Sequence, residues 1–240
     1  MISRFPLALL LNLLGASLAW IATSTTGLAQ DRSPAPRELL GLPLVFDDHF
    51  DEATPERYLF SDSKAWRWQT VEKRTVLEQF RASQVENPVR SPFNRALVRG
   101  LHLGDVIIDV QLQSTIKDYD HRDMCVFFGF QDPSHLYYVH LGKKADDHAN
   151  QVFVVNGAPR RKISLKSTGG TPWTDNWHHA RVVRRVESGE ILVYFDDMET
   201  PVMRAVDKTF DRGLVGVGTF DDTGRFDDLR VYGDRVDPRN

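Results

Sequence analysis

The sequence predicts an all-β fold in which two antiparallel sheets pack as a sandwich. Apolar and polar residues alternate with a period of two in many short segments, and turn-forming residues separate these segments. In the clearest segment, 105–113, one face carries only apolar residues: Val106, Ile108, Val110 and Leu112. No window long enough for a stable amphipathic helix interrupts the pattern. An antiparallel β-sandwich is the architecture that this pattern favours.

The other strands follow in order along the chain. We predict them at 124–130, 135–141, 151–155, 162–165, 180–186, 191–195, 214–220 and 226–232. Turn signals such as Asn156-Gly157 lie between them. The clearest hairpin is 183–195, with its turn at 187–190. The sequence has no internal repeat or low-complexity tract, so a single domain is predicted.

The first 29 residues have the layout of a secretory signal peptide. A single positive charge, Arg4, precedes an apolar run at 7–22, and 27–29 is a suitable cleavage site. The run is shorter than the roughly 20 residues that span a bilayer, so we expect cleavage rather than a retained anchor. The mature chain would be exported to the periplasm or the extracellular space, with no stable membrane span. The segments are predicted as signal peptide (1–29), linker (30–43), jelly-roll sandwich (44–233) and C-terminal tail (234–240).

Composition excludes several classes of protein. The 240 residues include 30 basic and 33 acidic ones, for a net charge of −3, so a broad basic surface for nucleic acid is not expected. The single cysteine, Cys125, cannot form an internal disulfide or a multi-thiolate metal site. It lies within predicted strand 124–130, where a free thiol packs as a small hydrophobe. Nothing in the sequence indicates the oligomeric state.

Two pairs of motifs resemble those of a known superfamily. The segment DNWHHARVV at 175–183 is followed by GEILVYFDD at 189–197, and VFDDHFD at 45–51 stands at the opposite end of the domain from 216–231. Together they resemble the concanavalin A-like lectin/glucanase jelly roll, in the wide sense that includes laminin G-like domains. The resemblance covers about 44–233. It implies that the first and last strands lie side by side.

The resemblance leaves the activity open, because jelly rolls of this kind host lectins, hydrolases, lyases and adhesion modules. A narrower similarity is to bacterial secreted domains of the 3-keto-disaccharide hydrolase type, which share the strand order and the Asn-Trp and Asn-Gly motifs. The paired glutamates of retaining glucanases, E-x-D-x-x-E on one strand, are absent from the sequence. A glucanase of that kind is therefore not expected.

The densest polar region is 135–151. Strand alternation places Tyr138 and His140 on one face, where we expect them to stack on a sugar and to hydrogen-bond with it. The residues predicted around them as the rim of the site are Arg122, Lys143, Asp147, His148, Asn150 and Trp173. The main expectation is therefore an exported domain that binds an oligo- or polysaccharide. The alternative is that these are ordinary amphipathic strand residues beside a solvated loop.

Two other functions remain open. An enzyme would use the same face, with His140 or His148 as the base and Tyr138 as the acid. Arg122 or Lys143 would then stabilise the developing anion. A laminin G-like module would instead bind a protein partner through an exposed apolar patch.

A metal site is expected where acidic residues near the two ends of the domain converge. Pairing of the terminal strands would bring together six aspartates: Asp47, Asp48, Asp221, Asp222, Asp227 and Asp228. Among them Asp48 and Asp228 are the predicted ligands. Carboxylates suit Ca²⁺, and the resemblance implies a structural calcium ion near such a strand. The alternative is that these acidic strand ends only keep the surface polar. The neighbours His178 and His179 leave opposite faces of a strand, which does not suit a zinc site.

Overall fold

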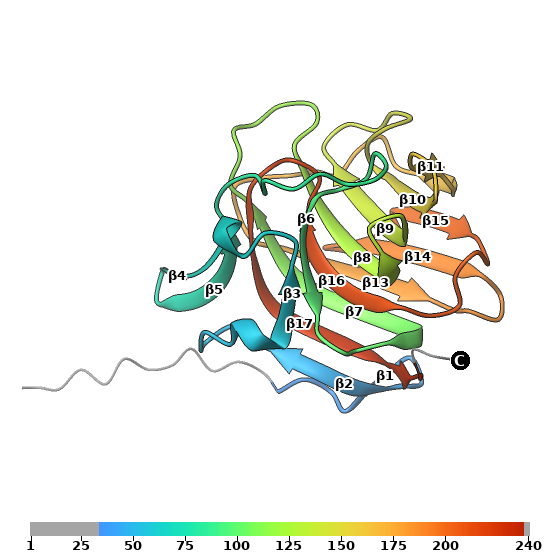
Figure 1. Cartoon of the computed structure of the whole chain (residues 1–240), viewed down its shortest axis with the longest axis horizontal. Helices are drawn as coiled ribbons and strands as arrows, with labels where there is room; N and C mark the ends of the chain where they lie inside the picture. The colour runs from blue at the N-terminus through green and yellow to red at the C-terminus, as the bar shows by residue number, and fades with distance from the viewer. Residues whose placement is uncertain (1–33, 238–240) are drawn as a thin grey trace, which may run out of the picture. The chain divides into compact units, whose positions relative to one another are not determined.

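Two antiparallel sheets form the fold, which confirms the predicted all-β sandwich (Figure 1). This computed structural model describes residues 34–237, so the predicted signal peptide (1–29) lies outside the described part. Within 34–237, helical structure is limited to two short 3-10 turns, η1 (Pro55–Arg57) and η2 (Ser63–Ala65). No helix in this range is long and apolar enough to cross a membrane.

The larger sheet has ten strands. Eight of them follow one another in the order β1 (Glu38–Leu39), β2 (Leu42–Asp48), β17 (Gly224–Arg235), β7 (Leu103–Ser114), β13 (His178–Arg184), β14 (Glu190–Phe195), β15 (Met203–Val206) and β12 (Ser164–Ser167). The remaining two are β4 (Trp66–Val71) and β5 (Arg74–Gln79). They form a hairpin that joins the sheet where β5 pairs with β17.

The smaller sheet has seven strands. Their order is β11 (Arg161–Lys162), β10 (Gln151–Asn156), β9 (His135–Gly142), β8 (Asp123–Asp132), β16 (Leu214–Thr219), β6 (Asn94–Val98) and β3 (Tyr58–Phe60). The central strands β8, β9 and β10 are consecutive in sequence and run antiparallel. The candidate site described below lies on this sheet.

Two predicted pairings are present. The terminal strands β2 and β17 pair antiparallel, with Leu229 opposite Asp48, so the ends of the domain lie side by side. The predicted hairpin is formed by β13 and β14, with Ala180 opposite Phe195.

Strand structure extends past both predicted boundaries of the sandwich. β1 and β2 begin inside the predicted linker (30–43), and β17 ends at Arg235, inside the predicted tail. The physical reason is apolar packing, because Leu39 and Leu42 contact a small cluster on the outer face of the larger sheet that includes Ile107 and Tyr232. Residues 38–43 therefore belong to the domain.

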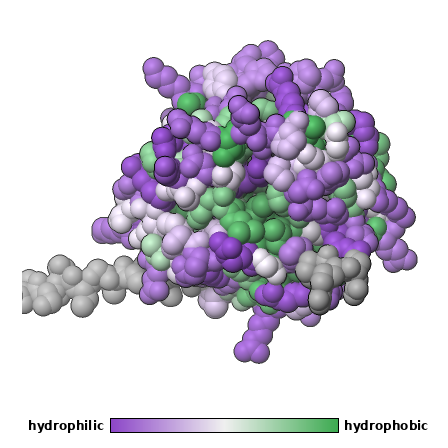
Figure 2. Space-filling view, in the orientation of Figure 1, coloured by the Kyte–Doolittle hydropathy of each residue, from purple (hydrophilic) through white to green (hydrophobic). Residues whose placement is uncertain are grey.

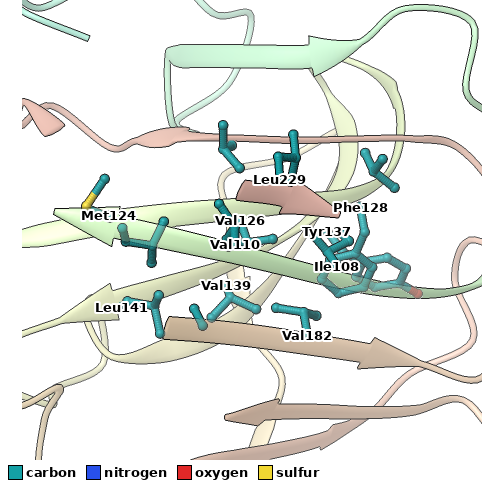
Figure 3. Packing of buried hydrophobic residues seen from close by; sticks show 14 of the residues in the cluster. Ile108, Val110, Met124, Val126, Phe128, Tyr137, Val139, Leu141, Val182 and Leu229 are labelled. Atoms are coloured by element: carbon teal, nitrogen blue, oxygen red, sulfur yellow. The ribbon is translucent and has the colours of Figure 1, made fainter. Parts of the chain in front are cut away.

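The main hydrophobic core lies between the two sheets. Figure 3 shows side chains of β7, such as Ile108 and Val110, meeting Val126 of β8 and Val139 of β9. Because side chains alternate along a strand, the intervening residues of β8, β9 and β10 point away from this core. Figure 2 shows one face of the molecule, on which hydrophilic residues surround hydrophobic residues that gather near the centre.

A second apolar cluster covers the outer face of the smaller sheet. Phe127, Tyr138 and Phe153 form its centre, one from each of β8, β9 and β10. Cys125 belongs to the same cluster as a free, buried thiol, as predicted. Next to this cluster the sheet face turns polar, and the candidate site lies there.

Candidate functional site

A cavity of about 270 Å³ opens on the outer face of the smaller sheet. Two of its lining residues stand on strands, Asp123 at the start of β8 and His140 on β9. The other lining residues come from loops: Arg90, Tyr119, His121, His148, Arg160, Phe220 and Asp221. A rigid floor of strand residues thus carries a rim of loop residues, which is a common arrangement for binding sites.

The floor of the cavity is a paired imidazole and carboxylate. The register places Cys125 opposite His140, so Asp123, two residues before Cys125, lies on the same face as the imidazole. His140 Nε2 lies 3.2 Å from Asp123 Oδ2. That oxygen also accepts hydrogen bonds from the Phe220 amide and from the Cys125 thiol. The side chains are therefore held in place by neighbours on three segments.

Two buried polar atoms of this pair lack a partner. His140 is 4% exposed and Asp123 is 1% exposed. Within residues 34–237, His140 Nδ1 and Asp123 Oδ1 have no hydrogen-bond partner. Leaving such a group unsatisfied costs about 1–3 kcal/mol, so native proteins rarely do so without a functional reason. Both residues line the cavity, where a ligand would meet them.

Two further carboxylates crowd Asp123. Asp222 accepts a hydrogen bond from the Tyr119 hydroxyl at 2.7 Å and one from the Asp123 amide at 2.8 Å. Burial, together with the charge of Asp123, raises the pKa of Asp222 to about 7. The same two causes raise the pKa of Asp221. The site therefore holds more negative charge than its surroundings compensate.

Two cationic side chains, Arg90 and Arg160, also line the cavity. The Arg160 guanidinium lies 4.2 Å from the centre of the Phe220 ring and 5.0 Å from that of Phe153. Arg90 stands over the same Phe220 ring at 5.9 Å. The half-buried ring of Phe220 thus lies beneath both arginines and offers an apolar surface to a ligand.

Of the residues that the sequence predicted for catalysis, His140 and His148 line this cavity together. Tyr138 does not, which corrects the prediction that it stacks on a sugar. It shares a face with His140, but its ring is fully buried and stacked on Phe153 with centroids 5.1 Å apart. Its hydroxyl accepts a hydrogen bond from Arg160. The aromatic cluster on this face covers Tyr138, so of these two residues only His140 lines the cavity.

Two residues predicted for the rim, Arg122 and Asn150, are buried in structural roles instead. Arg122 is 2% exposed and donates to the carbonyl and hydroxyl of Ser114 in the larger sheet. Asn150 has a φ of 54°, donates to the carbonyl of Thr168 and accepts from the hydroxyl of Thr171, both in the segment that follows β12. These two predictions are corrected for the same reason: their polar groups are satisfied away from the cavity.

The prediction that Trp173 belongs to the rim of the site is also corrected. Trp173 is 6% exposed and donates from Nε1 to the carbonyl of Leu141 at 2.7 Å. Its ring packs edge-on against Phe195, 5.1 Å between centroids. The Trp173 ring therefore belongs to the main core and cannot stack on a sugar.

Lys143 and Asp147 lie near the cavity without lining it. Lys143 is ion-paired with Asp118, and Asp147 with Lys162. Their roles in substrate binding stay predictions, and they would act only on a ligand that extends beyond the cavity.

The predicted calcium ligands stand on paired strands, but their carboxylates have other partners. Asp48 accepts hydrogen bonds from the Tyr58 hydroxyl and the Phe50 amide and forms an ion pair with Arg57. Asp228 contacts His49. A calcium ion there stays a prediction. Within 34–237 the three carboxylates that come closest together are those of Asp123, Asp221 and Asp222.

Sequence reasoning did not assign most of the cavity. Phe220, Arg90 and Arg160 were not identified as site residues, and Asp221 was considered only with the terminal acidic residues. A signal for Asp123 was present, because it begins a strand whose alternation places it on the same face as Cys125. No local signal marks Arg90, which reaches the site only through the path of a long loop.

Comparisons with known proteins support the fold. No family model and no curated protein sequence matches the chain. Among solved structures, the carbohydrate-binding module CBM66 from Bacillus subtilis matches with 15% identity and a TM-score of 0.51, over 74% of this chain and 96% of that one. A seed lectin of Lotus tetragonolobus matches with 12% identity and a TM-score of 0.51, over 80% and 99%.

The fold is a concanavalin A-like jelly roll. The GH43 protein BlXynB from Bacillus licheniformis matches with 12% identity and a TM-score of 0.54, over 78% of this chain but only 39% of that one. The neighbours of this jelly roll thus include a carbohydrate-binding module, a lectin and a part of a glycoside hydrolase. At such low identity the likeness establishes the architecture and not the site.

Proposed function

We propose that the protein binds carbohydrate in the cavity above His140 and Asp123. The observation that carries the proposal is the pair of unpartnered polar atoms on the cavity floor, His140 Nδ1 and Asp123 Oδ1. Sugar hydroxyls both donate and accept hydrogen bonds, so one sugar ring can satisfy both atoms. The Phe220 ring beside them offers the apolar surface that a sugar face needs.

The size and charge of the cavity limit the kind of glycan. Its volume of about 270 Å³ is below the range of roughly 300–1,000 Å³ that suits larger ligands. It therefore favours one terminal sugar unit over an internal stretch of a polysaccharide. The rim combines Arg90 and Arg160 with Asp221, so a polar or charged sugar suits it better than an uncharged apolar ligand.

Export is part of the same proposal. The composition of residues 1–29 predicts a signal peptide, and an exported protein would meet its glycan outside the cytoplasm. Immunoblotting of the cell fractions of a producing bacterium tests this. We expect a shortened chain in the exported fraction, and a full-length chain confined to the cytoplasm would contradict it.

One observation favours a glycan-active enzyme as the second candidate. A carboxylate that holds an imidazole at a cavity, as Asp123 holds His140, is the arrangement used to orient a general base. A neighbouring acid with a raised pKa, Asp221, supplies a proton donor at the same cavity. In this hypothesis the protein would release products from the glycan that it binds.

A glycan and polysaccharide panel on the purified full chain distinguishes the two candidates. We expect binding to at least one glycan, weakened by His140→Ala and unchanged by His135→Ala, a histidine on the same strand that pairs with Asp132 outside the cavity. Product release that His140→Ala abolishes would establish the enzyme. Silence across the panel, or equal effects of the two substitutions, would overturn the carbohydrate proposal.

A further inference from the structure

We propose that Asp123, Asp221 and Asp222 bind a divalent cation, Ca²⁺, at the edge of the cavity floor. The proposal shares Asp123 with the proposed glycan site, but it concerns the protein without any glycan, so its test is independent of the proposed function. It also differs in place from the calcium expected at Asp48 and Asp228.

The three carboxylates come together from two segments that are distant in sequence. Asp123 begins β8, and Asp221 and Asp222 form the turn between β16 and β17. One oxygen from each lies within 4.8 Å of the other two, a separation that a single ion can bridge. The turn is tied to the strand because Asp222 accepts the Asp123 amide and Asp123 accepts the Phe220 amide. The arrangement is thus fixed by the backbone and needs no rearrangement to bind an ion.

The negative charge of the cluster is not compensated by neighbouring cations. Among residues 34–237, neither lysine nor arginine forms an ion pair with these three carboxylates, and the one ion pair is that of His140 with Asp123. Arg90 and Arg160 influence Asp221 only from a longer distance. Three carboxylates this close repel one another strongly when ionised, and a divalent cation removes that repulsion.

An independent observation points to a ligand at this cluster. Asp123 is 1% exposed, lines the cavity, and has one carboxylate oxygen, Oδ1, without a hydrogen-bond partner in the described part of the chain. A buried carboxylate oxygen without a partner is costly. A cation bound by this oxygen and by the exposed Asp221 satisfies it. Waters or sugar hydroxyls would complete the coordination shell from the cavity.

The donor set favours calcium over a thiophilic metal. Carboxylate oxygens are hard ligands that suit Ca²⁺, whereas zinc prefers cysteine and histidine. Asp123 also belongs to a second group with Cys125 and His140. The Cys125 thiol, however, is fully buried, donates to Asp123 and does not line the cavity. Asp123 and Asp221 line the cavity, so an ion entering from it meets two of the three carboxylates before the buried Asp222.

Isothermal titration of CaCl₂ into the chelator-treated full chain, without glycan, tests the proposal. We expect one Ca²⁺ per chain and a rise in the melting temperature. Asp221→Asn and Asp222→Asn should each weaken the affinity by roughly 10–100-fold, at least the loss seen for outer-shell partners of metal sites. The matched control is Asp120→Asn, which removes an exposed carboxylate paired with Lys144 in the nearby loop.

Each possible outcome of this titration either supports or overturns the proposal. Asp221 is exposed, so Asp221→Asn keeps the fold, which circular dichroism verifies. Absence of Ca²⁺ binding, or equal affinity in Asp221→Asn and Asp120→Asn, would overturn the proposal. Zinc that binds more tightly than calcium and is lost in Cys125→Ser would place a metal at the other group instead. Because no glycan is present, failure of the carbohydrate proposal would not affect this result.

Discussion

The imidazole of His140 and the carboxylate of Asp123 lie 3.2 Å apart, Nε2 to Oδ2, on neighbouring strands of the smaller sheet. Each side chain keeps its other polar atom, Nδ1 or Oδ1, without a partner within residues 34–237. Both residues line the cavity that we propose as the binding site.

The role of Asp123 in the fold is testable by substitution. Asp123→Ala removes the acceptor of the partly buried Phe220 amide and leaves that group unsatisfied. We expect a loss of about 1–3 kcal/mol in the free energy of unfolding, measured by urea denaturation in the presence of chelator. Asp120→Ala, at an exposed position, should change it by less than about 0.5 kcal/mol. Equal stability of the two variants would contradict this role.

Stability should depend on pH through Asp222. The pKa of this carboxyl is about 7 in the folded protein and 3.8 in its unperturbed state, so the folded state holds a proton that the unfolded state releases. This contribution is complete below about pH 4 and is lost as the pH rises towards 7. In chelator, Asp222→Asn should therefore gain stability relative to the wild type between pH 5 and pH 8. A constant difference between the two urea midpoints would contradict this shift.

Tyr138 should contribute to packing and not to proton transfer. Tyr138→Phe keeps the ring that stacks on Phe153 and removes only the hydroxyl that accepts from Arg160. We expect a stability loss of about 0.5–1.5 kcal/mol with glycan binding and any product release unchanged. Tyr138→Ala should cost about 3–5 kcal/mol, because it empties a buried ring site. Loss of product release in a folded Tyr138→Phe protein would instead support the predicted role of Tyr138 as the catalytic acid.

Phe220 should supply the apolar contact for the sugar. Its half-buried ring lines the cavity beneath Arg90 and Arg160. Phe220→Ala should weaken glycan binding by roughly tenfold, the value of about 1.4 kcal/mol that a good aromatic contact provides. Phe80 offers a matched control, since its exposed ring also lies under an arginine, Arg67, outside the cavity. Similar losses in Phe220→Ala and Phe80→Ala would refute the contact.

The fold was predictable because its sequence signals lie within short segments or in similar motifs near both ends of the domain. Alternation in 105–113 gives the faces of β7, and the acidic motifs near both ends anticipate the pairing of β2 with β17. The boundaries were less predictable, since Leu39 and Leu42 gain their strand structure from packing on the larger sheet. Such contacts leave no periodic pattern in a short segment.

The site was predictable only in part, for a physical reason. Alternation gives the face on which Tyr138 and His140 lie, but it does not tell which of them other segments cover. Phe153 and Arg160 come from later in the chain and bury Tyr138, whereas His140 stays at the cavity. Loop residues such as Arg90 reach the site through tertiary packing alone. Their contribution is visible only once the loops are placed.

Nuclear magnetic resonance of the full chain with labelled histidine rings tests the central claim most directly. The best glycan of the panel is titrated into the protein, and the ring signals of the cavity histidines are compared with those of His135 and His179, which pair with aspartates elsewhere. Our account predicts that His140 and His148 shift in proportion to the bound fraction while His135 and His179 stay unchanged. Shifts confined to His135 or His179, or no shift with any glycan, would contradict it.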